Sequence, residues 1–397
     1  MKTNLQVGYE SEGYNVVSIL RAGERVRVEM KWDNRFKPVH SACGSKMRIC
    51  RKTVQEALDM PMGSTEATTL SYEAVQGCCP HCNQYETVRP LDIRENGKAT
   101  LRFMRFVSAL CRHVPATRVP ELVAISPASA WRYDFHVLSE QMPPPSLDGL
   151  QAILTDEKYL GKSQGFVTVV LNARNGELLH LAEGRNRESI DGFFQKLTPE
   201  QKRSILAVGI DRSGVYKAAV QEHLPEAEIV YDKFHLVANY NEVIDAVRRR
   251  TLAQANAEEK QFIKGQRYNL FRNSENLTES GQEQLDKLLK ANGEIESAYL
   301  LKDFLKTIWD YSSMAWAEKR LLSWIQIANE TCVPELMRFA KGLLKAKDGI
   351  LAFCKHRLTS AKIEAFNKSI QRVLYKTCGI SNMDYFFLKL RQISLRT

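Results

Sequence analysis

The 397-residue sequence lacks any apolar run close to the roughly 18 residues that span a lipid bilayer. Its start, MKTNLQVGYESEG, also lacks the apolar segment of a signal peptide. These absences predict a cytoplasmic protein without a membrane segment. Internal repeats and low-complexity tracts are missing too, and 44% hydrophobic with 26% charged residues is typical of a globular chain, not a disordered, collagenous or coiled-coil one.

Acidic residues are fewer than basic ones. The sequence has 46 Asp and Glu and 56 Lys and Arg, which gives a net charge of +10. The segment from Lys355 to Thr397 holds nine basic and two acidic residues. Such an excess is compatible with a polyanionic partner but is weak evidence by itself. The nine cysteines are an odd number, which argues against a disulfide framework and for metal ligands or buried thiols.

A proline run at residues 143–145 marks a connector, and the pattern that follows it predicts a mixed α/β domain. Residues 149–232 contain five short apolar runs: GLQAILTD, QGFVTVVLN, ELLHLAEG, SILAVGID and AEIVYD. The Asn175-Gly176 pair favours a type I′ turn between the second and third strands. Helical spacing is present between the third and fourth runs and between the fourth and fifth, and the second of these helices makes the fourth and fifth strands parallel. After Asp232 the apolar spacing predicts helices only.

Two short Cys and His motifs near the N-terminus have the spacing of a zinc site. His40 and Cys43 are separated by two residues, as are Cys79 and Cys82. Each such pair on a tight turn directs two side chains at one tetrahedral ion, and this spacing favours Cys79 over Cys78. The pattern predicts structural Zn²⁺ held by His40, Cys43, Cys79 and Cys82. The alternative is a scatter of buried thiols.

Apolar spacing between residues 101 and 138 predicts three short helices. The first ends before Pro115, the second begins at Thr117, and Ser126-Pro127 provides an N-cap and first-turn proline for the third. With Trp131, Phe135 and Leu138 inward, this arrangement resembles a helix-turn-helix, whose last helix enters the DNA major groove. The outward candidates for DNA contact are Ser129, Arg132, Tyr133 and His136. Any three-helix packing unit would show the same spacing.

Three aspartates stand at the ends of predicted strands: Asp156, Asp211 and Asp232. The carboxyl ends of parallel strands meet at one edge of an open sheet, so Asp211 and Asp232 are expected to face one crevice. Asp156 joins them if the first strand lies beside the fourth. Clustered carboxylates repel one another unless a cation is bound, and oxygen ligands select Mg²⁺ or Mn²⁺. The alternative is that each aspartate is a helix cap.

Three stretches carry a resemblance to a known family. One is VGID at 208–211, continuing through YKAAV to LPEAEIVYDKFH, which ends at His235; the others are LTDE at 154–157 and LTSAKIEAFN at 358–367. They resemble the transposases of bacterial insertion sequences of the ISL3 family. The resemblance implies an RNase H-like α/β fold and a catalytic DDE triad of Asp156, Asp211 and Glu364 that binds magnesium (or Mn²⁺). Asp232 and His235 would support this triad. Without the resemblance, Glu364 is an ordinary helix residue spaced to pair with Lys368.

The resemblance also implies the domain organisation. The expected parts are a zinc-ribbon-like domain at 1–98, a helix-turn-helix DNA-binding domain at 99–142 and a linker at 143–149. They are followed by an RNase H-like catalytic domain with a mixed five-stranded sheet at 150–232 and 356–397, interrupted by a large all-helical insertion at 233–355.

The implied function is that of a transposase in the bacterial nucleoid. It would bind the terminal inverted repeats of its element in double-stranded DNA, as a dimer at least, and catalyse cleavage and strand transfer at those ends and at target DNA. Two other functions remain open. One is a catalytically inactive or domesticated DNA-binding protein, and the other is an RNase H-like nuclease that hydrolyses without joining.

Overall fold

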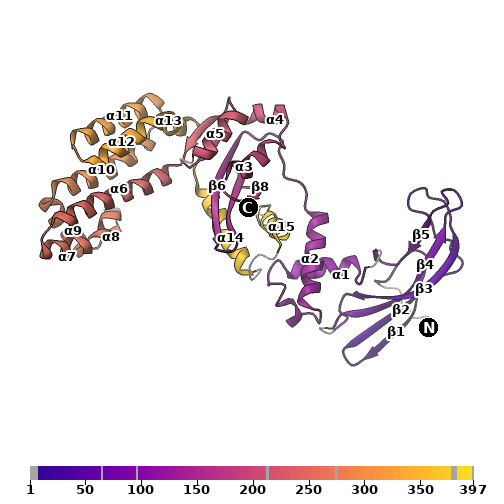
Figure 1. Cartoon of the computed structure of the whole chain (residues 1–397). Coiled ribbons are helices and arrows are strands. Elements are labelled where there is room, and N and C mark those ends of the chain that lie inside the picture. Colours follow the sequence, from indigo (N-terminus) through magenta and orange to yellow (C-terminus); the bar gives the residue numbers. More distant parts are fainter. Residues whose placement is uncertain are drawn as a thin grey trace. The chain divides into compact units, whose positions relative to one another are not determined.

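The computed structural model describes residues 8–63, 66–94, 97–211, 214–272, 276–376 and 382–395. The chain divides into two compact units. Figure 1 labels their helices and strands. The first contains residues 1–143 and 371–392, and the second contains residues 144–370 and 393–397.

The first unit begins with a five-stranded sheet. Its strands are β1 (Tyr14–Ala22), β2 (Arg25–Trp32), β3 (Arg48–Asp59), β4 (Thr68–Cys78) and β5 (Tyr85–Val88). Their order is β1-β2-β4-β3, and β5 also pairs with β4. Alternate residues of β2, from Val26 to Trp32, are buried, which is the period-two pattern of a sheet with one covered face. Tyr14 packs edge-on against Trp32 beneath the sheet.

Two α-helices follow the sheet, where the sequence pattern predicts three. They are α1 (Leu101–Leu110) and α2 (Pro127–Gln141), joined through the short 3-10 helix η1 (Val119–Glu121). The short middle helix predicted from Thr117 is thus reduced to a 3-10 turn: Pro115 precedes it and Pro120 lies within it, and each lacks a backbone donor. The predicted cap of α2 is confirmed, because Ser126 Oγ accepts a hydrogen bond of 3.1 Å from the Ser129 amide.

The helix α15 (Met383–Ser394) packs against α2 within the first unit. Asp134 of α2 is fully buried, and its Oδ2 accepts hydrogen bonds from Tyr385 Oη (2.6 Å) and Lys389 Nζ (3.0 Å). Ser108 Oγ donates to the other oxygen at 2.8 Å. Residues 371–392 thus belong to the first compact unit, although the sequence pattern groups them with the catalytic segment.

The second unit contains the five strands expected from the sequence. They are β6 (Ala152–Gly161), β7 (Gly165–Asn172), β8 (Leu178–Glu183), β9 (Ala207–Ile210) and β10 (Glu228–Tyr231), in the order β10-β9-β6-β7-β8. The β6-β7-β8 meander is antiparallel, whereas β9 is parallel to both β6 and β10. The expected helices are present as α3 (Arg187–Phe194) and α5 (Gly214–His223), with α4 (Pro199–Ser204) before β9. The mixed α/β class is confirmed.

The turn between β7 and β8 differs from the expected type I′ turn. The Asn172 amide donates to the Glu177 carbonyl at 2.9 Å, so four residues form the loop. Gly176 has a φ of 77°, whereas Asn175 has no positive φ, which a type I′ turn requires. The side-chain oxygens of Asn172 and Asn175 accept from the backbone amides of Arg174 and Glu177, and these local bonds favour the longer loop.

The described part after Asp232 is helical, as predicted. Besides α15, its α-helices are α6 (Lys233–Gln254), α7 (Ala257–Gly265), α8 (Arg267–Phe271), α9 (Glu279–Ala291), α10 (Gly293–Lys306), α11 (Met314–Glu330), α12 (Pro334–Lys345), α13 (Lys347–His356) and α14 (Ala361–Lys376). Tyr240, Trp324 and Phe339 pack ring against ring in the core of this segment. In the described ranges, we find no helix with the length and apolar character needed to cross a membrane.

Candidate functional site

Three aspartates lie at one level of three neighbouring parallel strands. Ala152 of β6 pairs with Ala207 of β9, which pairs with Glu228 of β10. Counting four residues along each strand from this level leads to Asp156, Asp211 and Asp232. Residues at one level of adjacent parallel strands point to the same face of the sheet, and the three aspartates line one small cavity together with His235. The expectation that Asp156 joins the other two is confirmed.

Asp156 differs in one respect from the expectation, because it lies within β6 and not after its end. The β6 strand continues to Gly161 through its antiparallel pairing with β7, while its parallel pairing with β9 ends at Leu154. The aspartate therefore stands where β9 stops covering the edge of β6.

The environment of these carboxylates disfavours a buried negative charge. Burial raises the pKa of Asp156, and the charge of Asp211 adds to the effect. Hydrogen bonds from the Glu157 amide and from Asn367 Nδ2, both 2.8 Å, oppose that rise. Burial also raises the pKa of Glu157, again with a contribution from Asp211. A bound cation would relieve this repulsion.

Two buried oxygens at the cavity have no hydrogen-bond partner among the described residues: Thr155 Oγ1 and Asp232 Oδ2. Asp232 caps α6 with its other oxygen, which accepts from the Phe234 amide at 3.1 Å. His235 Nε2 lies 3.6 Å from Asp232 Oδ2, an ion-pair distance when the imidazole is protonated. Buried oxygens of this kind are completed by water or by an ion in folded proteins.

Glu364 lies near this cavity but is not part of its lining. It is exposed in the first turn of α14, and its Oε1 accepts a 2.6 Å hydrogen bond from Ser360 Oγ. Ser360 and Ile363 do line the cavity. Across the described ranges, no ion pair joins Glu364 to Lys368. The carboxylates there form no set of three or more groups close enough to share an ion.

The sequence pattern does not predict the contact between Asn367 and Asp156. The Asn367 side chain reaches Asp156 from α14, across 211 positions of the chain. The one available signal was its spacing, because residue 367 lies one helical turn after the apolar Ile363 and three residues after Glu364.

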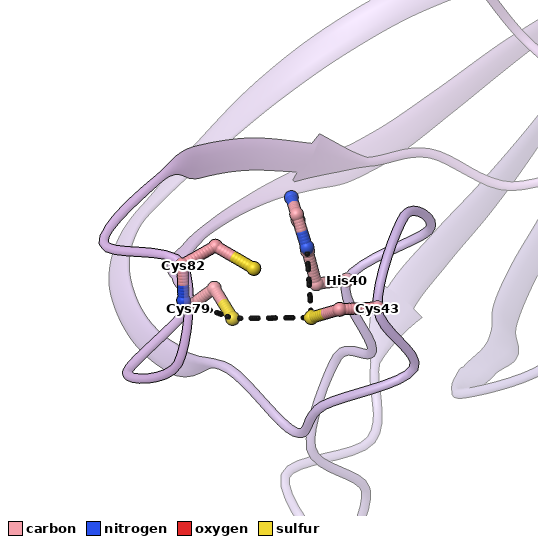
Figure 2. Close-up of side chains that lie close together, drawn as sticks. All are labelled: His40, Cys43, Cys79 and Cys82. Atoms are coloured by element: carbon pink, nitrogen blue, oxygen red, sulfur yellow. Dashed lines mark hydrogen bonds between the residues drawn. The ribbon is translucent and has the colours of Figure 1, made fainter.

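The four predicted zinc ligands come together in the first unit (Figure 2). The ligand atoms of His40, Cys43, Cys79 and Cys82 all lie within 4.8 Å of one another. His40 Nδ1 is 3.2 Å from Cys43 Sγ, which is 3.6 Å from Cys79 Sγ. Cys79 is fully buried in this group, and among the described residues it is Cys79, not Cys78, whose sulfur lies with the other three.

The two loops that carry these ligands have the same backbone hydrogen bonds. The amide of His40 donates to the Ser45 carbonyl, and the Gly44 amide donates back to the His40 carbonyl, both at 2.9 Å. Cys79 repeats both bonds with Gln84 and Asn83 at 2.8 and 2.9 Å. Gly44 and Asn83 both have positive φ, at 69° and 53°. Each loop is thus a tight turn that directs its first and fourth residues to the same point.

The electrostatics of this cluster fit a cation. Hydrogen bonds from Ser45, with further ones from His40 and Cys82, lower the pKa of the Cys43 thiol to about 5. The hydrogen bond to the Cys43 sulfur, together with burial, holds the proton on Cys82 and raises the pKa of that thiol to about 11. A metal ion would allow both thiols to ionise. His40 Nε2 lies 3.8 Å from Glu86 Oε2, on the side away from the sulfurs, as in many histidine ligands of zinc.

The four candidate DNA contacts of α2 line one pocket of the first unit, together with Arg94 and Lys98: Ser129, Arg132, Tyr133 and His136. Tyr133 is mostly buried and packs edge-on against Phe103, so its expected outward position was wrong. The buried stripe of α2 runs through Ala130, Asp134, Val137 and Leu138. Trp131 and Phe135, expected inward, are half-buried against Tyr385 of α15.

In comparisons with known proteins, this chain is similar to transposases. Residues 153–390 match a family described as transposase, of the ISL3 type. The chain is 31% identical over 353 residues to the transposase of insertion sequence element IS1001 from Bordetella parapertussis, covering 88% of this chain and 87% of that protein. It is 27% identical over 245 residues to the transposase of insertion sequence element IS1557 from Mycobacterium tuberculosis, covering 56% of this chain and 55% of that protein. The protein therefore belongs to the ISL3 family of insertion-sequence transposases.

Proposed function

We propose that this protein binds the terminal inverted repeats of an insertion sequence and catalyses metal-dependent cleavage and strand transfer of double-stranded DNA. The observation that carries the proposal is the row of Asp156, Asp211 and Asp232 on three parallel strands above one cavity. A row of carboxylates that faces one small cavity is suited to divalent cations, which prefer oxygen ligands.

The catalytic triad in this proposal is Asp156, Asp211 and Glu364. The first two already share the cavity, and Glu364 stands one residue after Ile363, which lines it. Glu364 is exposed and accepts a hydrogen bond from Ser360, and its carboxylate would have to leave this bond and adopt another rotamer to join the aspartates. Bound Mg²⁺ (or Mn²⁺) would supply Lewis-acid catalysis of in-line displacement at phosphorus. Asp232 would add negative charge, and His235 would contact the scissile phosphate.

The first unit is the proposed DNA-binding part. Zn²⁺ bound by His40, Cys43, Cys79 and Cys82 would join the two loops of the zinc-ribbon-like domain at 1–98. The segment 99–142 would serve as a helix-turn-helix in which Ser129, Arg132 and His136 contact DNA, and Tyr133 supports them from the core. The RNase H-like fold would then be formed by 150–232 and the start of α14, with 233–355 as its helical insertion.

Transposition joins two element ends, so the proposed active species is a homo-oligomer, a dimer at least, on DNA. The decisive experiment incubates the purified protein with a labelled element end, a target plasmid and Mg²⁺. Cleavage with joining supports the proposal. Cleavage without joining indicates a nuclease, and binding without cleavage indicates an inactive DNA-binding relative.

A further inference from the structure

Asn367 joins the helix of Glu364 to the row of aspartates. Its Nδ2 donates a 2.8 Å hydrogen bond to Asp156 Oδ2, so β6 and α14 are connected by side chains at the cavity. The other oxygen of Asp156 accepts from the Glu157 amide. Together the two bonds define the plane of the Asp156 carboxylate, since each oxygen has a donor in a different direction.

The remaining atom of the Asn367 amide is unsatisfied. An ionised carboxylate only accepts hydrogen bonds, so the amide presents its nitrogen to Asp156 and its Oδ1 elsewhere. This Oδ1 is buried and has no partner among the described residues. A buried acceptor left unpaired is unfavourable, and such atoms occur where a bound group completes the site.

The position of Asn367 on α14 gives its contact a second consequence. Ile363 and Asn367 are one turn apart and lie on the same side of the helix, where Ile363 lines the cavity. Glu364 directly follows Ile363 in the helix. Anchoring Asn367 to Asp156 therefore sets the rotation of α14 about its axis and keeps Glu364 at the edge of the cavity.

We infer that Asn367 is a positioning residue of the proposed metal centre. Its amide orients the carboxylate of Asp156 and couples it to the helix that carries Glu364. The inference rests on the proposed function, because it assigns Asn367 a role in the same site.

The test compares metal binding and cleavage in full-length variants. Asn367→Ala removes the donor, and Asn367→Leu removes it while nearly keeping the side-chain volume. We expect both to weaken Mn²⁺ binding, measured by electron paramagnetic resonance, by about 10- to 100-fold, the usual effect of losing a hydrogen bond to a ligand. The Mg²⁺ concentration for half-maximal cleavage should rise in parallel, with unchanged affinity for the element end. The matched control is Ser369→Ala, because the Ser369 hydroxyl donates to the Ala365 carbonyl of its own helix.

The outcomes distinguish a failure of the positioning role of Asn367 from a failure of the proposed metal centre. Wild-type metal affinity in both Asn367 variants, or in Asn367→Leu alone, overturns the inference, because the side chain then only fills space. Asp156→Ala tests the proposed function itself. If Asp156→Ala binds Mn²⁺ and cleaves normally, the metal centre is wrongly placed. If it loses both while the Asn367 variants lose neither, only the positioning role is refuted.

Discussion

Asp211 and Asp232 directly follow two paired strands, with Ile210 opposite Tyr231, so their carboxylates leave the sheet at the same level. The Asp232 amide donates to the Ile210 carbonyl at 3.2 Å, which continues the ladder to the last position before the helix α6. Two carboxylates at the same level of a parallel sheet edge repel each other when both are ionised.

Replacing Asp156, Asp211 or Glu364 with Ala should abolish cleavage and strand transfer together, because both steps would use the same ions. Binding of the element end should persist, since the proposed DNA contacts lie in the other unit. Gel-based cleavage and strand-transfer assays measure the first effect, and fluorescence anisotropy measures the second. Near-normal cleavage by Glu364→Ala would refute the triad; an ordinary surface glutamate costs at most ~0.5 kcal/mol of stability on removal.

Asp156→Asn should raise the melting temperature of the protein at pH 7 when no divalent metal is added. Burial raises the pKa of Asp156, so the folded state holds its proton at pH values where the unfolded chain has lost it. The resulting stabilisation is complete below the unfolded pKa of about 3.9 and is lost as the pH rises through the folded pKa. The advantage of the variant should therefore shrink toward pH 4. Calorimetry at several pH values checks this, with the exposed Asp148→Asn as control.

Protein purified without added metal should contain one Zn²⁺ per chain by elemental analysis. Cys79→Ser should lose the ion and unfold the loops around it, because tetrahedral sites of this kind supply folding free energy directly. Cys78→Ser is the matched control, since the thiol of Cys78 is adjacent to Cys79 in the chain but does not belong to the cluster. A well-folded first unit free of metal would contradict the assignment.

Removing residues 1–145 should abolish selection of the element ends and leave weak, salt-sensitive DNA binding, since phosphate contacts carry no sequence information. Arg132→Ala should relax base choice more than it weakens total binding. Competition assays with mismatched ends measure both. Arg203→Ala removes an equal charge, one paired with Glu200 on the second unit, and should leave specificity intact. Undiminished specificity in the truncated protein would exclude this role for the first unit.

Lys389→Ala should destabilise the first unit by about 3 kcal/mol, because it leaves the buried carboxylate of Asp134 without its cation. The double variant Asp134→Asn with Lys389→Met should recover part of the loss, since the charge itself is gone. Chemical denaturation measures both, and Lys368→Ala, an exposed lysine of α14, serves as control. Equal stability of Lys389→Ala and the wild type would mean that α15 contributes nothing through this pair.

Local patterns in the sequence were enough for several features. The apolar runs identified β6 to β10, because strand periodicity and bounding turn residues act over a few positions. The spacing of Cys79 and Cys82 identified their loop, since a tight turn is a local structure. Asp211 and Asp232 were found in the same way, as residues that directly follow short buried strands.

The tertiary structure decided what depends on partners distant in the chain. The burial of Tyr133 and the partial exposure of Trp131 follow from two surfaces that cover α2, and helical periodicity cannot show how many sides of a helix are covered. The same holds for Asn367, whose partner Asp156 lies 211 residues earlier. The sequence by itself determined the strands β6 to β10, the helical character after Asp232 and the two Cys and His loops, because short-range sterics and hydrogen bonds dictate these. Only the folded chain decided which side chains meet, because that depends on packing between segments that no local pattern records.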